Sequence, residues 1–193
     1  MPEPAPQTRL LVTAFEPFGA PGKPKRASNA SEETLRAFAA RHPGRCTVVI
    51  LPVDARCEVA LARAMNGNPA GVVATGEAGL AGGWDTNVEM LAWDRPVDVS
   101  RPGGNGTRGD AERCARSAFA PRLHLLPGME REERIGSYWC NRAYYRVLQW
   151  CALFGRPGVF LHQRVDGARG AQLRHLEHVV TAMERETAAL ARA

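Results

Sequence analysis

Residues 136–162 read GSYWCNRAYYRVLQWCALFGRPGVFLH and predict a helix that is followed closely by a strand. Over 141–154 the apolar residues recur at helical spacing. The residues that share this apolar face are Ala143, Val147, Cys151 and Phe154. The short apolar run 159–161 then predicts a buried strand that ends at His162. A helix that leads into a buried strand is typical of an α/β protein.

The same alternation extends over the rest of the chain. Apolar runs rich in β-branched residues predict strands, and apolar residues at helical spacing predict helices between them. The predicted strands are 9–14, 46–51, 71–75, 88–93, 122–126 and 159–161. The first predicted helix begins near Ser31, and the others cover 55–66, 110–119, 141–154 and 171–191. This order predicts an α/β fold, a three-layer α/β/α sandwich around a largely parallel, twisted sheet.

Length and composition favour one domain. The chain has 193 residues, of which 45% are hydrophobic, enough for a core that needs no disulfide or metal. No boundary separates two domains, so 1–193 is predicted to fold as a single domain. Residues 1–8 are Pro-rich and are expected to be loose.

Charge and hydropathy exclude two classes of partner. The net charge is +5, but the arginines are scattered among acidic residues. The one basic cluster (Lys23, Lys25 and Arg26) is too short for a nucleic-acid-binding arm. No apolar stretch reaches the length of a signal peptide or a transmembrane helix, so we expect no membrane contact and a cytoplasmic location.

Five cysteines give an odd count without a CxxC or zinc-binding spacing. In the cytoplasm they stay reduced, which allows cysteine chemistry. Cys140 stands out because it directly precedes the predicted helix 141–154, with Asn141 as a natural N-cap residue. The positive end of the helix dipole and the nearby Arg142 favour a thiolate there. The alternative is a buried, inert cysteine, which suits Cys46 and Cys151.

Two further side chains could complete a catalytic set with this cysteine. His162 lies at the end of a predicted strand, where an imidazole can act as a base. Glu89 interrupts the apolar run 88–93, where a carboxylate is costly unless it has a partner. A structural histidine and an outward-facing glutamate are the alternatives. His175 and His178 could hold a metal, but a solvated helix face explains them better, so we expect no metal site.

Several segments match one known family in chain order, from about Leu10 to His162. They are 11–19 (LVTAFEPFG), 29–31 (NAS), 51–53 (LPV), 76–79 (GEAG) or 79–83 (GLAGG), 88–92 (VEMLA), 136–141 (GSYWCN) and 160–162 (FLH). They are similar to motifs of the pyroglutamyl peptidase I family, also called pyrrolidone-carboxylate peptidases, which are cysteine peptidases. The chain therefore resembles a divergent member of this family.

The resemblance implies a thiol omega peptidase that removes N-terminal pyroglutamyl groups from peptides. Cys140 would be the nucleophile, His162 the base, and Glu89 the residue that orients His162. The resemblance also assigns residues to substrate binding, namely Phe15, Phe18, Tyr138 and Glu77. It implies an α/β/α sandwich, no cofactor, a peptide or small amide as substrate, and a homo-oligomer as a common state of the family.

Some positions depart from the family pattern. They are Ala14, Met90, Asp94, Ile135 and the pair Gln163–Arg164. The family's glutamine position falls on either Glu77 or Leu80. Two other hypotheses therefore stay open: a hydrolase of another small amide or lactam, and a catalytically silent member that serves binding or assembly.

Overall fold

The computed structural model describes residues 9–19, 24–79, 83–99, 113–133 and 136–192. In chain order the elements are β1 (Leu11–Phe15), α1 (Ala30–Arg41), β2 (Thr47–Leu51), α2 (Arg56–Met65), β3 (Val72–Ala78), β4 (Thr86–Glu89), β5 (Leu91–Trp93), β6 (Cys114–Arg116), the 3₁₀ helix η1 (Ala120–Arg122), β7 (Met129–Glu132), α3 (Trp139–Phe154), β8 (Gly158–Arg164) and α4 (Arg169–Leu190).

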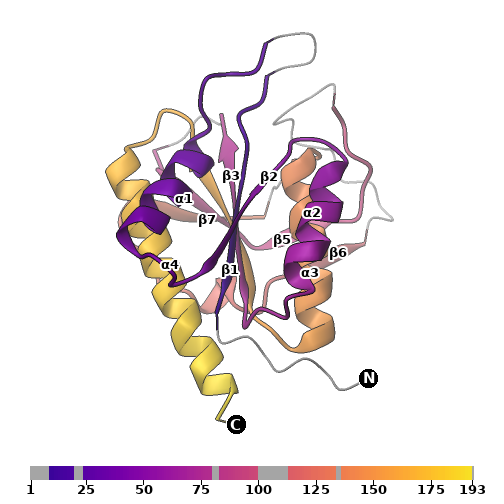
Figure 1. The fold of residues 1–193 in the computed structure, drawn as a ribbon, viewed down its shortest axis with the longest axis vertical. Coiled ribbons are helices and arrows are strands. Elements are labelled where there is room, and N and C mark those ends of the chain that lie inside the picture. Colours follow the sequence, from indigo (N-terminus) through magenta and orange to yellow (C-terminus); the bar gives the residue numbers. More distant parts are fainter. Residues whose placement is uncertain (1–8, 20–23, 80–82, 100–112, 134–135, 193) are drawn as a thin grey trace.

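A six-stranded sheet in the order β2-β1-β3-β8-β4-β7 forms the middle layer. β2, β1, β3 and β8 run parallel to one another, whereas β4 pairs antiparallel with β8 and parallel with β7. Figure 1 shows α1 and α4 together on one side of the sheet and α2 and α3 on the other. The predicted three-layer α/β/α fold with a largely parallel sheet is confirmed.

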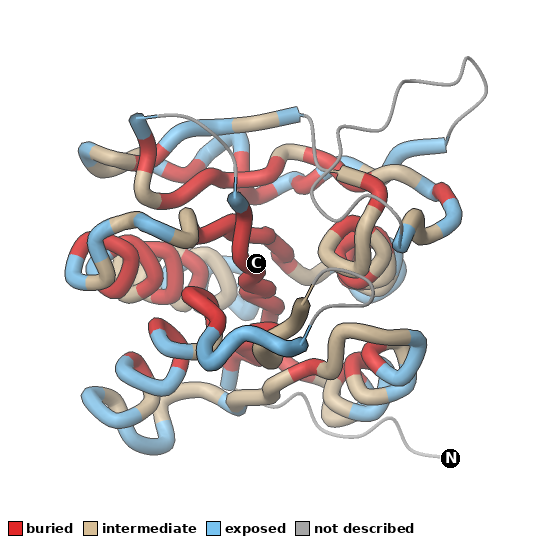
Figure 2. The backbone as a smooth tube through the Cα atoms, turned by 90° about the horizontal axis from the view of Figure 1, so that it is seen from above, coloured by how far each residue is buried: buried red, intermediate tan, exposed pale blue. Residues whose placement is uncertain are grey.

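The central strands are apolar on both sides because helices cover both faces. All five residues of β1 are buried, and so are all seven of β3. Alternate residues enter opposite cores, since Val73 packs on the side of α1 and α4, whereas Val72 and Ala74 pack on the side of α2 and α3. Seen from above, the buried residues lie along the centre of the molecule (Figure 2).

The segment 88–93 is not one strand, as the sequence predicted, but two. β4 ends at Glu89 and stays in the main sheet, and β5 begins at Leu91 and pairs with β6 in a separate two-stranded sheet. Met90 marks the change, because its N–H donates to the carbonyl of Glu132 (2.8 Å) and its carbonyl accepts from Ser117 (3.0 Å). Hydrogen bonds to two different neighbours redirect the chain at this point.

Two other predictions are wrong. The described part of the predicted helix 110–119 contains β6, because pairing with β5 overrides the local helical spacing. The predicted strand 122–126 has no regular structure beyond η1, where Pro121 favours a helical start. The strand in this region is instead β7, a polar edge strand that its sequence MERE did not reveal.

No described helix is long and apolar enough to cross a membrane.

The close approach of β8 and α3 depends on Gly158. A Cβ at this position would lie 2.5 Å from Sγ of Cys151 and 3.2 Å from Cγ1 of Val147. Overpacking of this kind typically costs about 1–3 kcal/mol. We therefore expect Gly158→Ala to lower the melting temperature by roughly 2–12 °C, which differential scanning calorimetry would measure.

The matched control is Gly79→Ala, because a Cβ there has no neighbour within 4 Å among the described residues. Adding Cys151→Ala to Gly158→Ala removes the clashing sulfur and should recover part of the loss. If the double variant is as unstable as the sum of the two single variants, the clash with Cys151 is not the cause.

Candidate active site

The pairing of β4 with β8 brings Glu89 and His162 together. In the antiparallel register Glu89 lies opposite Phe160, and His162 lies two residues further along β8. All three side chains therefore point to the same face of the sheet, the one that α2 and α3 cover. The ring nitrogen Nδ1 of His162 lies 2.7 Å from Oε1 of Glu89. Glu89 is only 2% exposed, so this contact is shielded from water.

Cys140 reaches the same point from the first turn of α3. This helix begins at Trp139 with Tyr138 as its N-cap residue, two residues earlier than the sequence predicted. Asn141 is therefore not the N-cap. Cys140 lies close enough to His162 for its side chain to raise the pKa of the ring. Because Nδ1 of His162 faces Glu89, Nε2 is the nitrogen that faces the sulfur. The structure thus brings Cys140, His162 and Glu89 into one chain of contacts.

Gly76 provides the space for this sulfur. It lies opposite His162 in the parallel pair of β3 and β8. A Cβ at Gly76 would lie 2.8 Å from Sγ of Cys140 and 2.8 Å from Cζ of Phe160. No side chain larger than hydrogen fits between these atoms without displacing one of them. The sequence indicated a loop at this position, but β3 continues to Ala78.

The start of α3 is suited to hold negative charge. The first N–H groups of a helix lack acceptors within the helix, and the Tyr138 side chain does not cap them. The first turn contains no acidic residue. These amides and the helix dipole favour an anion at Cys140 or a developing oxyanion beside it.

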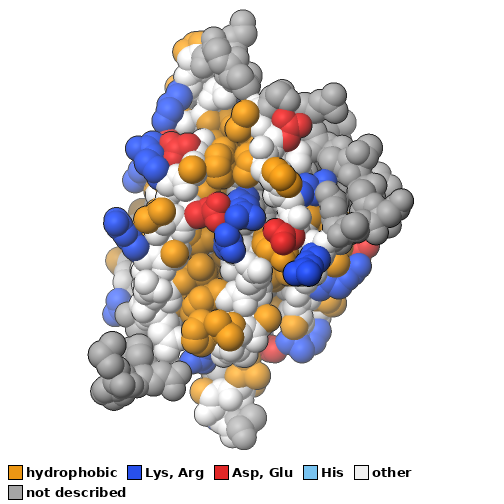
Figure 3. Space-filling model, turned by 90° about the vertical axis from the view of Figure 1, so that its right-hand side faces the viewer, with side chains coloured by type: hydrophobic (Ala, Val, Ile, Leu, Met, Phe, Trp, Pro, Cys, Tyr) orange, Lys and Arg blue, Asp and Glu red, His pale blue; other side chains and the backbone are white. Residues whose placement is uncertain are grey.

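Two carboxylates partly balance the positive charge of Arg142, so it favours a thiolate at Cys140 less than the sequence indicated. Its Nε lies 3.1 Å from Oε1 of Glu58, and its Nη1 lies 3.5 Å from Oδ1 of Asp94. Arg146 binds the second oxygen of Glu58. Figure 3 shows the molecule from the side of α2 and α3, where basic and acidic side chains lie next to one another among apolar ones. The helix start, rather than Arg142, therefore dominates the electrostatics at Cys140.

The acid–base properties of the pair fit a proton-transfer role. Burial alone would lower the pKa of His162, but the hydrogen bonds to Cys140 and Glu89 and their negative charges raise it to about 10. Burial raises the pKa of Glu89, and the contact with His162 opposes this effect. The contacts with Cys140 and Glu89 therefore favour the protonated form of the imidazole.

Three other cysteines lack this environment. Burial raises the pKa of Cys46 to about 11 and the pKa values of Cys57 and Cys151 to about 12. These side chains remain thiols at neutral pH. Cys114 is exposed. It lies on β6, whereas the sequence predicted a helix at this position.

Two of the predicted substrate-binding aromatic residues, Phe18 and Tyr138, form a ring pair, and Tyr138 lies two residues before Cys140. The rings of Phe18 and Tyr138 are 5.8 Å apart, and both residues are partly exposed. Burial raises the pKa of Tyr138, and the charge of Cys140 raises it further, which places the phenol near the sulfur. Phe15 differs, because it is 2% exposed and packs in the core beneath α2 and α3. The structure gives Phe15 a packing role.

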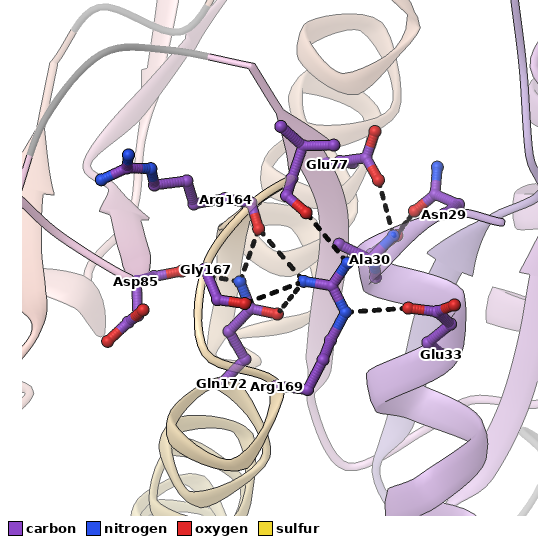
Figure 4. Close-up of polar contacts among 11 residues, drawn as sticks. Asn29, Ala30, Glu33, Glu77, Asp85, Arg164, Gly167, Arg169 and Gln172 are labelled. Carbon is purple, nitrogen blue, oxygen red and sulfur yellow. Dashed lines mark hydrogen bonds and ion pairs between the residues drawn. The ribbon is translucent and has the colours of Figure 1, made fainter. Parts of the chain in front are cut away.

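Glu77 does not lie with Cys140. It follows Gly76 in β3 and therefore points to the opposite face of the sheet. One carboxylate oxygen accepts from the backbone N–H of Ala30 at the start of α1 (2.6 Å), and the other pairs with Arg26. Figure 4 shows Glu77 directed at the N-terminus of α1. These contacts occupy both carboxylate oxygens of Glu77, whose role in substrate binding stays a prediction, and Leu80 lies outside the described residues.

Asn141 and Tyr144 are site residues that the sequence did not identify. Asn141 accepts from the backbone N–H of Trp93 (2.8 Å) and donates to its carbonyl (2.9 Å), which fixes β5 to the start of α3. The hydroxyl of Tyr144 donates to the carbonyl of Glu89 (2.8 Å). Neither contact has a sequence signal, because each depends on which backbone group approaches the helix.

The described residues contain no group of three or more His, Cys, Asp or Glu side chains that could hold a metal ion. His175, predicted to lie on a solvated helix face, is instead buried and binds Oγ1 of Thr86 and the carbonyl of Pro127, both at 3.0 Å. His178 contacts the carbonyl of His124.

No protein-family model and no curated protein sequence matches the chain. Several solved structures do, all of them pyrrolidone carboxyl peptidases. A variant of the Pyrococcus furiosus protein is 20% identical with a TM-score of 0.70, covering 92% of this chain and 99% of that one.

The protein from Thermococcus litoralis is 21% identical with a TM-score of 0.66, over 92% of this chain and 93% of that one. The protein from Thermus thermophilus is 26% identical with a TM-score of 0.61, over 91% and 96% of the two chains. The chain therefore has the fold of the pyrrolidone carboxyl peptidases, and the predicted resemblance to a divergent member of this family is confirmed at that level.

Glu89 should determine the pKa of His162. We expect Glu89→Gln to lower that pKa from about 10 towards its ordinary value near 6.5, because the buried anion is lost. The folded-state pKa of the wild type exceeds the unfolded value, so protonated His162 stabilises the fold below about pH 6.5 and this contribution is lost towards pH 10. NMR titration of the His162 ring and unfolding at the two pH values would measure both effects.

Glu132→Gln is the matched control, because the Glu132 side chain accepts from the backbone N–H of Glu133 and acts on Glu89 through its charge. It should leave the pKa of His162 near that of the wild type. A His162 that titrates identically in the wild type and in Glu89→Gln would contradict the pairing.

Gly76→Ala should displace the sulfur of Cys140, since the added Cβ would lie 2.8 Å from it. Displacement of a reacting group by about 1 Å typically costs about 10–100-fold in rate. We expect the alkylation of Cys140 by iodoacetamide, read by peptide mass, to become slower by a factor in this range. Gly79→Ala should react like the wild type, and the same rate in both variants would show that Gly76 does not position the sulfur.

Proposed function

We propose that this protein is a cysteine peptidase of the pyroglutamyl peptidase I type that removes N-terminal pyroglutamyl groups from peptides. The observation that carries the proposal is the buried contact chain from Cys140 through His162 to Glu89 at the open start of α3. A cysteine, a base and a residue that orients the base are the parts that thiol acyl transfer needs. The fold shared with pyrrolidone carboxyl peptidases supports the same reaction class.

In the proposed first step the Cys140 thiolate attacks the carbonyl carbon of the pyroglutamyl–peptide bond. Backbone N–H groups at the start of α3 stabilise the resulting oxyanion. Protonated His162 gives its proton to the leaving amine, and the carbon–nitrogen bond breaks. The products are a thioester on Cys140 and the shortened peptide.

In the second step neutral His162 takes a proton from water, and the hydroxide formed attacks the thioester. Pyroglutamate leaves, and the thiolate–imidazolium pair is restored. Glu89 stabilises the charged imidazole in both steps and keeps Nε2 directed at the sulfur. The reaction requires no cofactor.

The aromatic pair formed by Phe18 and Tyr138 supports a small lactam as the acyl group. Phe18 and Tyr138 form a partly exposed aromatic pair next to Cys140. Aromatic rings offer a large rigid surface at low entropic cost, which suits a flat five-membered ring. A cytoplasmic location is consistent with this proposal, because the five free cysteines would stay reduced there.

A fluorogenic pyroglutamyl aminomethylcoumarin tests the proposal. The wild type should release the coumarin, and Cys140→Ala and His162→Ala should each lose activity by at least about a thousandfold. Cys114→Ser is the matched control, because Cys114 is a free, exposed thiol outside the site. This variant should keep the activity of the wild type.

Iodoacetamide labelling at neutral pH separates the nucleophile from the substrate. Cys140 should label faster than Cys114, although Cys114 is the more exposed of the two. Equal or slower labelling of Cys140 would contradict the activated thiolate. Fast labelling without turnover of the pyroglutamyl substrate would contradict the proposed substrate and favour a hydrolase of another small amide or lactam.

A further inference from the structure

Arg26 makes an unusual set of contacts with Phe18. Its backbone N–H and its Nε each donate to the carbonyl of Phe18 at 3.2 Å. Its guanidinium carbon lies 4.7 Å from the centre of the Phe18 ring. One arginine therefore holds both the backbone and the ring of the same residue. A guanidinium within about 6 Å of a ring centroid is close enough for a cation–π contact.

Glu77 restrains the position of Arg26 through an ion pair. Its side chain is 3% exposed and forms an ion pair with Nη2 of Arg26. The other carboxylate oxygen accepts from Ala30 at the start of α1. A buried carboxylate that also caps a helix has little freedom to move, so it is a rigid anchor for the arginine. This explains why an acidic residue is tolerated at the buried end of β3.

The contacts continue from Phe18 to the nucleophile. The Phe18 ring meets the ring of Tyr138 at 5.8 Å with a tilt of 41°. Tyr138 is the N-cap residue of α3, two positions before Cys140. The sequence of contacts is thus Glu77, Arg26, Phe18, Tyr138 and Cys140, and it links the two faces of the sheet.

We propose that Arg26 is a positioning residue that, anchored by Glu77, holds Phe18 against Tyr138 and thereby sets the aromatic wall beside Cys140. What this wall binds rests on the proposed function, but the positioning itself does not. Phe18 lies in the connection between β1 and α1, outside any helix or strand. Without Arg26 its ring would keep only the contact with Tyr138 among the contacts described above.

Tyrosine NMR tests the positioning independently of any activity. The chain has three tyrosines, so ring-labelled protein gives three signals, and Tyr138→Phe assigns the relevant one. The nearby Phe18 ring shifts the Tyr138 signal through its ring current. Phe18→Leu should move this signal, and Arg26→Lys and Glu77→Gln should move it in the same direction. The signals of Tyr144 and Tyr145 should stay in place.

Arg36→Gln is the matched control, because Arg36 pairs with Glu32 on the exposed side of α1. It removes one arginine without touching Phe18 and should leave the Tyr138 signal unchanged. If Phe18→Leu moves the signal but Arg26→Lys does not, Arg26 does not position the ring. If Phe18→Leu has no effect either, the aromatic pair does not form in solution, and the inference is wrong.

Kinetics then show whether the wall serves the substrate. In Arg26→Lys we expect kcat/KM for the pyroglutamyl substrate to fall about tenfold, mainly through a higher KM, since substrate contact is weakened and the nucleophile is not. Alkylation of Cys140 by iodoacetamide should stay within about twofold of the wild-type rate, because this small reagent needs no wall. A purely structural role would lower both rates together. A wild type without turnover would contradict the proposed function, and the NMR result would still decide the role of Arg26.

Discussion

The candidate site depends on the antiparallel pairing of β4 with β8. This is the place where the otherwise parallel sheet reverses direction, and its register sets Glu89 diagonally across from His162 on one face. A slip by one residue would turn the Glu89 side chain to the face of α1 and α4, far from Cys140. Tyr144 reinforces the register from α3 by binding the carbonyl of Glu89. The pairing therefore aligns the sheet and the acid–base pair at once.

Burial makes this alignment costly. Oε2 of Glu89 has no hydrogen-bond partner among the described residues, and Oδ1 of Asn87, opposite His162, is in the same situation. Buried carboxylates without full pairing destabilise a fold, and apolar residues of similar size are often more stable. These buried groups lower the stability of the fold, so packing does not explain their presence. Acid–base chemistry is the function that fits them.

The two helix starts near the site are treated in opposite ways. The start of α1 has a neutral cap and several acids beside it: Asn29 caps it, Glu32 and Glu33 lie in its first turn, and Glu77 binds its first N–H. The start of α3 has no side-chain cap and no acid in its first turn. Its positive end is thus left for Cys140, whereas that of α1 holds Glu77, which is the anchor of Arg26. The same backbone electrostatics supports chemistry in one layer and architecture in the other.

The sequence by itself determined the layered α/β fold, because apolar runs covered on both faces and helical periodicity are local properties of the chain. It also identified Cys140, His162 and Glu89, since a cysteine at a helix start, a histidine at a strand end and an acid in an apolar run are each visible without partners. Only the tertiary structure decided which neighbours polar residues take. It divided 88–93 between two sheets and placed the Glu77 carboxylate at the start of α1. Periodicity reports how far a residue is buried, but pairing register and the approach of distant loops decide what that residue meets.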